Sequence, residues 1–271
     1  MTPGTDRSRL LHEIVALVRV AHVEIMRVYA EPASWELKAD SSPLTVADLA
    51  SHRVLADGLA RLEPSLPVLS EEGGLPDPGT RASWAAYWLI DPLDGTKEFL
   101  ARNGEFTVNV ALVEGTRPTL GVVGVPARDQ LFVGDVAGGL AQRLDASGAR
   151  DVRARRYVGS RPTVVASRRH GGEKLEGALH AMAKDEGAPE LRNVGSALKL
   201  CLLAEGEADI YPRLAPTSEW DTAAAQAVLE AAGGAVLQLN GEPVAYNKAE
   251  VLNPEFVAVA DRTVDWLRFF R

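Results

Sequence analysis

A long apolar run that ends at two closely spaced aspartates constrains this chain most strongly. Residues 84–90 are predicted to form a buried strand that delivers Asp91 at its C-terminal end. Pro92 then fixes φ near −65°, and Gly95 permits a tight turn, so that Asp94 can point back beside the first carboxylate. Two carboxylates this close repel each other unless a cation lies between them or one is protonated. Mg²⁺, a hard ion that prefers oxygen ligands, meets this requirement; an acidic surface turn is the plainer alternative.

Three further acidic residues are candidates, and each also has a simpler explanation. Glu71 belongs to an acidic pair after a predicted strand at 67–69, and such pairs are usually only solvated. Asp221 lies in the first turn of a predicted helix, where acidic residues interact favourably with the helix dipole. Asp48 is the fourth residue of a Thr-x-x-Asp pattern that is typical of a capping box. None of these residues indicates a site by itself.

Composition excludes several classes of protein. The chain has 271 residues and a formal net charge of −8, which argues against a long nucleic-acid footprint but not against a small anionic substrate. Cys201 is the only cysteine, so an intrachain disulfide is impossible, and apolar helix packing is its simplest role. No signal-peptide pattern and no apolar run of about 18 residues is present, so we expect a cytoplasmic protein without a membrane span.

Helical and strand patterns are mixed along the chain and predict an α/β architecture in two halves. We place the halves at residues 1–136 and 137–271, because the Gly- and Arg-rich stretch 136–160 is weakly patterned. A Pro- and Ser-containing loop is expected over 32–43. Helices are expected at 10–28, 49–62, 196–205 and 219–232, and strands at 67–69, 84–90, 106–113, 120–125, 130–134, 163–166 and 209–211.

Taken together, the acidic segments resemble a known family. Glu71, the hexapeptide Asp91–Thr96 and the tetrapeptide Trp220–Ala223 resemble the metal-binding signatures of the inositol monophosphatase-like, lithium-sensitive phosphatase superfamily. Gly195–Leu198 matches a further segment of that family, and the resemblance covers nearly the whole chain. It implies a layered α-β-α-β-α sandwich, as in inositol monophosphatase and fructose-1,6-bisphosphatase, with one site between the halves.

The resemblance also implies roles for individual residues. The implied ligands of two or three Mg²⁺ ions are Glu71, Asp91, the backbone carbonyl of Leu93, Asp94 and Asp221. The implied catalytic residues are Asp48 and Thr96, which would polarise a metal-activated water for in-line attack on phosphorus, together with Glu71. The backbone N–H groups of Gly95 and Thr96 would hold the phosphate.

Within the superfamily, the chain is most similar to the CysQ-type 3'(2'),5'-bisphosphate nucleotidases. This similarity is carried by Lys97–Phe99, Asn103–Asn109, Gly195–Lys199, Ala204–Gly206 and Tyr211–Arg213. The implied substrate contacts are Gly95, Thr96, His170, Ser196, Lys199, Arg213 and Asp221. Charge is the physical discriminator: inositol phosphatases carry an acidic residue near Arg213, whereas a cation there favours a second phosphate or an electron-rich base. Ser196 and Lys199 are expected to share one face of a helix.

The resemblance therefore implies hydrolysis of 3'-phosphoadenosine 5'-phosphate to AMP and phosphate, and it leaves open whether the sulfated form is also a substrate. Two alternatives remain at this point: an inositol or sugar monophosphate phosphatase, and a non-catalytic nucleotide sensor on the same fold. No nucleic-acid polymer is an expected partner. Oligomeric state, metal number, lithium sensitivity and the peripheral attachment to the inner face of the membrane reported for some relatives are open questions.

Overall fold

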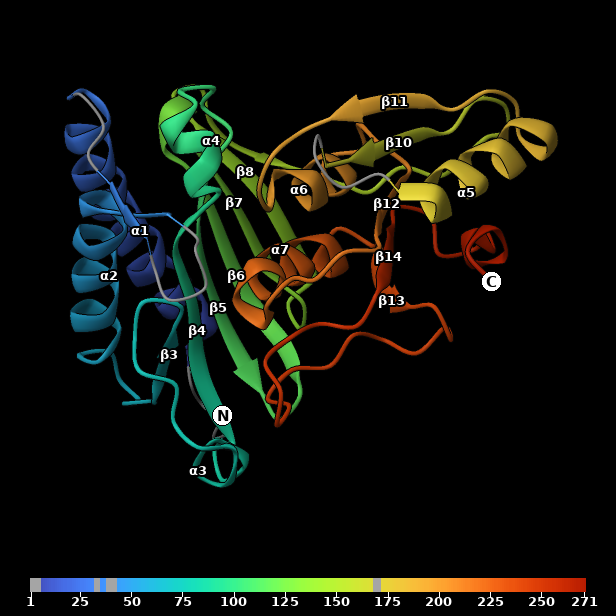
Figure 1. The fold of residues 1–271 in the computed structure, drawn as a ribbon. Helices are drawn as coiled ribbons and strands as arrows, with labels where there is room; N and C mark the ends of the chain where they lie inside the picture. The colour runs from blue at the N-terminus through green and yellow to red at the C-terminus, as the bar shows by residue number, and fades with distance from the viewer. Residues whose placement is uncertain (1–5, 32–34, 38–42, 168–171) are drawn as a thin grey trace.

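Two β-sheets alternate with three layers of helices, so that the chain forms an α-β-α-β-α sandwich (Figure 1). The computed structural model describes residues 6–31, 35–37, 43–167 and 172–271. The helices are α1 (Arg7–Tyr29), α2 (Val46–Leu59), α3 (Pro78–Ala82), α4 (Thr96–Leu100), α5 (Gly172–Asp185), α6 (Leu198–Ala204) and α7 (Glu219–Ala231), with the 3₁₀ turns η1 (Pro126–Arg128) and η2 (Trp266–Phe269). The layered architecture expected from the sequence is confirmed.

The larger sheet has seven strands in sequential order. They are β3 (Val68–Ser70), β4 (Ala86–Asp94), β5 (Thr107–Glu114), β6 (Arg117–Val125), β7 (Gln130–Asp135), β8 (Leu140–Asp145) and β9 (Gly148–Asp151). β3 and β4 pair in parallel, and the following pairs are antiparallel. Trp88 and Ile90 pack with the residues of α1 and α2, whereas Tyr87 and Leu89 pack with those of α6 and α7. The apolar run is therefore a strand that is buried on both faces.

The smaller sheet has five strands, ordered β11-β10-β12-β14-β13. They are β10 (Thr163–Ala166), β11 (Glu190–Asn193), β12 (Ile210–Arg213), β13 (Ala235–Gln238) and β14 (Phe256–Val259). Val165 faces α6 and α7, while its neighbour Val164 packs on the other side with α5 and η2. The layer of α6 and α7 is thus covered by a sheet on each side.

Several elements differ from the sequence-based expectation. β8 and β9 continue the first sheet to Asp151, past the expected division at residue 136. All residues of β9 are exposed, and their sequence shows no alternation of apolar and polar residues that would mark a strand. Within the expected loop 32–43, β1 (Trp35–Leu37) pairs with β2 (Pro43–Thr45). α6 begins at Leu198 rather than at Ser196, because Ser196 has φ +50°, outside the helical region. The helices α3, α4 and α5 and the strand β11 are additional to the expected elements.

Helix α7 lies unusually close to the seven-stranded sheet at two glycines. A Cβ atom on Gly121 of β6 would lie 2.1 Å from the carbonyl oxygen of Ala224, and one on Gly134 of β7 would lie 2.6 Å from Cα of Val228. Real Cβ atoms do not approach other atoms so closely. The helix is therefore held at a depth that only glycine at these strand positions allows.

Within the described residues, no helix combines the length and apolarity needed to cross a bilayer.

A buried histidine makes stability depend on pH. His22 on α1 is 6% exposed, and neither ring nitrogen has a hydrogen-bond partner among the described residues. Burial lowers its pKa to about 4; Arg19 lowers the pKa further and Asp129 opposes the shift. The unfolded chain, with an ordinary pKa near 6.5, therefore binds a proton that the folded protein excludes, and stability falls as pH drops from about 6.5 towards 4.

We expect His22→Leu to remove this part of the acid sensitivity. Between pH 7.5 and pH 5 the wild-type free energy of unfolding should fall by about 2 kcal/mol more than that of the variant. The reason is that the variant lacks the imidazole ring that binds a proton on unfolding. Urea unfolding at the two pH values measures the difference. An equal loss of stability in both proteins would contradict the assignment to His22.

Candidate metal centre and adjoining pocket

The parallel pairing of β3 and β4 places two of the predicted ligands side by side. Ser70 is in register with Ile90, and the N–H of Glu71 donates to the carbonyl of Ile90 (3.2 Å). Glu71 and Asp91 therefore follow neighbouring positions at the same edge of the sheet. Asp91 also shares the face of Leu89, which is directed towards α7.

A one-residue bulge brings Asp94 to the same face. β4 advances from Asp91 to Asp94 while β5 advances only from Asn109 to Thr107, so β4 carries an extra residue. Without it, the two aspartates would point to opposite faces. One oxygen of Asp94, Oδ2, accepts from the Thr107 hydroxyl (3.2 Å), the Asn109 amide (3.4 Å) and the N–H of Ala197 (2.6 Å). These donors fix the orientation of the carboxylate.

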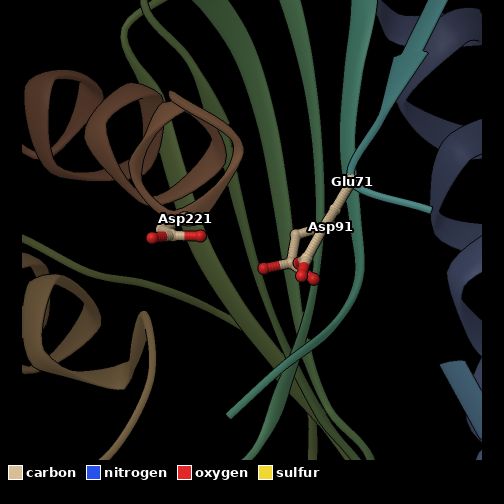
Figure 2. A group of neighbouring side chains, drawn as sticks. All are labelled: Glu71, Asp91 and Asp221. Carbon is tan, nitrogen blue, oxygen red and sulfur yellow. The ribbon is translucent and has the colours of Figure 1, made fainter. Parts of the chain in front are cut away.

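Helix α7 brings the last predicted ligand. Oδ2 of Asp221 accepts from the N–H of Ser218, the N-cap residue, at 2.9 Å in a capping box. The capping explanation therefore holds, and the residue also lies at the site: Glu71, Asp91 and Asp221 each offer an oxygen within 4.8 Å of the others. Figure 2 shows Asp221 extending from the helix towards the two carboxylates at the strand ends. Among the described residues the tight acidic group has these three members, and Asp94 adjoins it.

The electrostatics of this group fit a hard divalent cation. Burial, followed by repulsion from Glu71, Asp94 and Asp221, raises the pKa of Asp91 well above its ordinary value. Burial and the charge of Asp94 raise the pKa of Asp221 to about 8. Burial also raises the pKa of Asp94, although Lys199 opposes this shift. Buried and half-buried carboxylates that repel one another, and whose donor atoms are all oxygen, form the kind of group that Mg²⁺ or a similar ion stabilises.

Asp48 and Thr96 lie together next to the bulge. The hydroxyl of Thr96 donates to Oδ1 of Asp48 (3.3 Å) and lies 3.5 Å from the carbonyl oxygen of Leu93. The other oxygen of Asp48 accepts from the N–H and hydroxyl of Thr45 at 2.7 and 2.5 Å, which completes the capping box of α2. The structural and the functional explanation of Asp48 are thus compatible, because each uses a different carboxylate oxygen.

A pocket adjoins the carboxylates and brings together most of the predicted substrate contacts. Gly95, Ser196, Lys199, Arg213 and Asp221 line it, with Asp94 at its inner wall. His170 lies outside the described residues. Residues from both halves of the chain therefore meet at one opening.

Lys199 supplies a buried cation at this pocket. It is 6% exposed, and its ammonium group donates to the carbonyl oxygens of Ser196 (2.6 Å) and Val194 (3.4 Å) and lies 5.3 Å from the ring centre of Tyr211. Burial lowers its pKa to about 8, although the charge of Asp94 opposes the shift. At neutral pH the ammonium therefore stays mostly protonated.

Arg213 is a second cation at the pocket. Its guanidinium donates to the carbonyls of Ala215 (3.0 Å) and Pro216 (2.8 Å), in the segment that leads into α7. These bonds hold the positive group at the pocket wall, next to the start of the helix that carries Asp221.

Thr107 and Asn109 were not predicted as site residues. They hold Asp94 in place, and the sequence contains a signal for them: both are polar residues at alternate positions of an otherwise apolar strand. The structure shows that both side chains are buried. Buried polar side chains need hydrogen-bond partners, so such positions indicate a polar neighbour.

Comparison with known proteins agrees with this geometry. The 3'(2'),5'-bisphosphate nucleotidase CysQ of Escherichia coli O157:H7 is 44% identical over 252 residues, which cover 91% of this chain and 98% of that protein. The crystal structure of CysQ from Bacteroides thetaiotaomicron superposes with a TM-score of 0.83 at 38% identity and covers 94% of this chain and 98% of its own. An inositol monophosphatase from Anabaena (Nostoc) sp. PCC 7120 shares the fold, with a TM-score of 0.75 at 24% identity over 97% of this chain and 95% of that one. Residues 6–264 also match the sequence pattern of the Inositol monophosphatase family, and the chain belongs to that family.

Proposed function

We propose that this chain is a magnesium-dependent phosphomonoesterase that hydrolyses 3'-phosphoadenosine 5'-phosphate to AMP and phosphate. The observation that carries the proposal is the convergence of Glu71, Asp91 and Asp221 beside a pocket that also holds Lys199 and Arg213. An acidic group suits a metal-dependent phosphatase, and the two cations suit a substrate with a second phosphate. The name and 44% identity of the Escherichia coli relative support the same substrate class.

We assign metal binding to the carboxylates of the acidic group and to their neighbour Asp94. The family is known for metal-dependent catalysis, and the acidic group could hold such an ion. We assign Glu71, Asp91, Asp94, Asp221 and the carbonyl of Leu93 as the ligands of two or three Mg²⁺ ions. When bound, Mg²⁺ neutralises the carboxylates and stabilises the negative charge that develops on the phosphate oxygens.

Thr96 and Asp48 are assigned to proton transfer. With its own proton directed at Oδ1 of Asp48, the Thr96 hydroxyl has a lone pair available to accept a hydrogen bond from the attacking water. As the water attacks phosphorus in line, it gives a proton to the Thr96 hydroxyl, whose own proton moves to Oδ1 of Asp48. The bond from phosphorus to the leaving oxygen breaks, and the alkoxide takes up a proton from solvent water to form the product hydroxyl. Glu71 completes the catalytic set by orienting the nucleophile.

The remaining assignments concern the substrate. Backbone N–H groups of Gly95 and Thr96, at the start of α4, hold the phosphate that is cleaved. Lys199 and Arg213 pair with the second phosphate, and Ser196 contributes a hydroxyl at the same wall. His170 completes the assigned contacts. In this scheme the N-terminal half supplies most metal ligands, and the C-terminal half supplies Asp221 and most substrate contacts.

Substrate-panel kinetics test the proposal. Phosphate release should require Mg²⁺ and should have a kcat/KM for 3'-phosphoadenosine 5'-phosphate at least tenfold above that for inositol 1-phosphate. The sulfated nucleotide belongs in the same panel and decides whether it is a second substrate. A preference for inositol 1-phosphate would overturn the nucleotide assignment, and tight nucleotide binding without phosphate release would indicate a sensor.

Arg213→Met is expected to weaken recognition of the second phosphate. A hydrogen-bonded charge pair contributes about 1.5–3 kcal/mol, so kcat/KM for the bisphosphate should fall by roughly 10–100-fold. Adenosine 3'-monophosphate, which lacks the second phosphate, provides the matched control and should lose far less. An equal fall for both substrates would show that Arg213 does not read the second phosphate.

A further inference from the structure

A buried arginine outside the pocket joins two distant parts of the chain. Arg81 in α3 is 1% exposed, and its guanidinium donates to three backbone carbonyls: Pro76 (3.1 Å), Lys248 (2.9 Å) and Ala249 (2.8 Å). Pro76 lies on the segment that runs from Glu71 to α3. The arginine therefore ties the segment that carries one acidic ligand to the stretch of residues 247–249, which we term the bridge segment.

A buried glutamate holds the same bridge segment from its other side. Glu219 is 0% exposed; its Oε2 accepts from the N–H of Asn247 (2.9 Å), and its Oε1 accepts from the N–H (3.1 Å) and the ammonium (2.5 Å) of Lys248. Glu219 is the first residue of α7, and Asp221 follows it by two positions. The backbone N–H groups of the bridge segment thus donate to Glu219, on the helix that carries Asp221. The backbone carbonyls of the bridge segment accept from Arg81.

The start of α7 is further fixed by the residues after the bridge segment. The N–H of Asn253 donates to the carbonyl of Thr217 (2.7 Å), and its side-chain amide donates to the carbonyl of Ser218 (2.7 Å). The N–H of Glu219 donates to the carbonyl of Val251 (2.9 Å). The start of α7 is therefore hydrogen-bonded both to the bridge segment and to the residues that follow it.

We propose that Arg81 and Glu219 are positioning residues that set the separation of Glu71 and Asp221 through the bridge segment, and thereby the affinity of the acidic group for its cation. The inference rests on the proposed metal site. The carboxylates repel one another when no cation is bound, and the bridge segment adds a restraint between the segment after β3 and the start of α7, beyond the packing of α7 on the sheet. A group that is already assembled binds its ion with less reorganisation.

Binding of Mn²⁺ to the full chain without substrate tests the proposal. In Arg81→Met and Glu219→Gln, the dissociation constant, followed by the electron paramagnetic resonance signal of free Mn²⁺, should rise by about 10–100-fold, as for other residues that support metal ligands. The Mg²⁺ concentration that gives half-maximal turnover should rise in parallel. The KM for the nucleotide, measured at saturating Mg²⁺, should change little, because neither Arg81 nor Glu219 lines the pocket.

Arg155→Met is the control for loss of an arginine that is hydrogen-bonded to buried groups elsewhere in the fold. Arg155 donates to Asp209 (2.7 and 2.5 Å) and to the hydroxyl of Thr163 (2.9 Å), beside the smaller sheet. The Arg155→Met substitution should lower the thermal midpoint but leave the Mn²⁺ affinity as in the wild type. If Arg81→Met and Glu219→Gln lower the midpoint and also leave Mn²⁺ affinity unchanged, the positioning role is overturned.

Two further measurements keep the outcome decisive. Lys248→Met removes the ammonium contacts to Glu219, the carbonyl of Ala245 and the side chain of Asn253, but keeps the backbone bonds of the bridge segment. If Arg81→Met does not fold, this variant is compared with Arg155→Met in the same way. A wild-type protein that binds Mn²⁺ but releases no phosphate from the nucleotide would reject the proposed function and leave the positioning role standing. If the enzyme is active but Arg81→Met, Glu219→Gln and Lys248→Met all bind Mn²⁺ as the wild type does, the positioning role is rejected and the proposed function stands.

Discussion

Asp91→Asn should abolish turnover and at the same time stabilise the metal-free protein. The substitution removes a proposed Mg²⁺ ligand, and stabilisation of the transition state worth several kcal/mol corresponds to a fall in kcat of at least about 10³-fold. It also removes a carboxyl group whose ionised form is disfavoured by burial and by repulsion from Glu71, Asp94 and Asp221. The asparagine oxygen can still accept from the N–H of Leu93, which now donates to Asp91 at 3.1 Å. We therefore expect the thermal midpoint without metal to rise by roughly 2–4 °C.

Steady-state phosphate release and thermal unfolding, each with and without Mg²⁺, measure the two effects. Asp209→Asn is the control, because Asp209 is also buried but pairs with Arg155, and neither residue lines the pocket. This control should lose stability, since it leaves a cation unpaired, and should keep most of its turnover. Turnover of Asp91→Asn within tenfold of the wild type would show that this carboxylate is not a ligand, and a lower metal-free midpoint would show that the group is not under repulsion.

Gly121→Ala should destabilise the fold and weaken metal binding together. The added methyl would lie 2.1 Å from the carbonyl oxygen of Ala224 and 2.9 Å from Cβ of Ala227, so α7 must move away from the sheet. Overpacking of this kind costs about 1–3 kcal/mol or somewhat more, and we expect about 3 kcal/mol because the clash is with backbone. Since Asp221 is on the same helix, the Mn²⁺ dissociation constant should also rise by roughly tenfold or more.

Gly177→Ala provides a matched control for the same chemical change. Gly177 is in α5, and a Cβ there would meet nothing within 4 Å. Alanine favours a helix interior over glycine, so this variant should be more stable by about 0.5–1 kcal/mol, with unaltered Mn²⁺ binding. Urea unfolding and Mn²⁺ titration of both variants provide the comparison. A Gly121→Ala protein that unfolds like the wild type would mean that α7 has room to move.

The sequence predicts those parts of the fold whose patterns are local. The buried run that ends at Asp91 is one such part, because both of its faces are apolar and a turn with Pro92 follows. The predicted helices of the outer and middle layers are confirmed, with ends that differ by a few residues. β9 could not be predicted, since its residues are all exposed and carry no alternation.

The acidic residues of the site could be predicted from the sequence, but the residues that support them could not. Residue type and the family resemblance identified the acidic residues, and the structure brings Glu71, Asp91 and Asp221 into one group. Their functional roles, and that of His170 outside the described residues, remain proposals. Arg81 and Glu219 could not be identified from the sequence, because nothing local separates a buried charged residue from a solvated one. Their burial follows only from the three-dimensional path of residues 247–249.

The bulge in β4 makes the number of residues between Asp91 and Asp94 a structural requirement. Loss of one residue from this interval would remove the bulge: the two carboxylates would still share a face, but at ordinary strand spacing, and the turn that places the Leu93 carbonyl 3.5 Å from the Thr96 hydroxyl would be lost. Replacement of Leu93 by another apolar residue keeps the spacing, whereas a deletion does not. Insertions and deletions in this turn should therefore be tolerated far less than substitutions, even though it follows the edge of the sheet where chains usually vary in length.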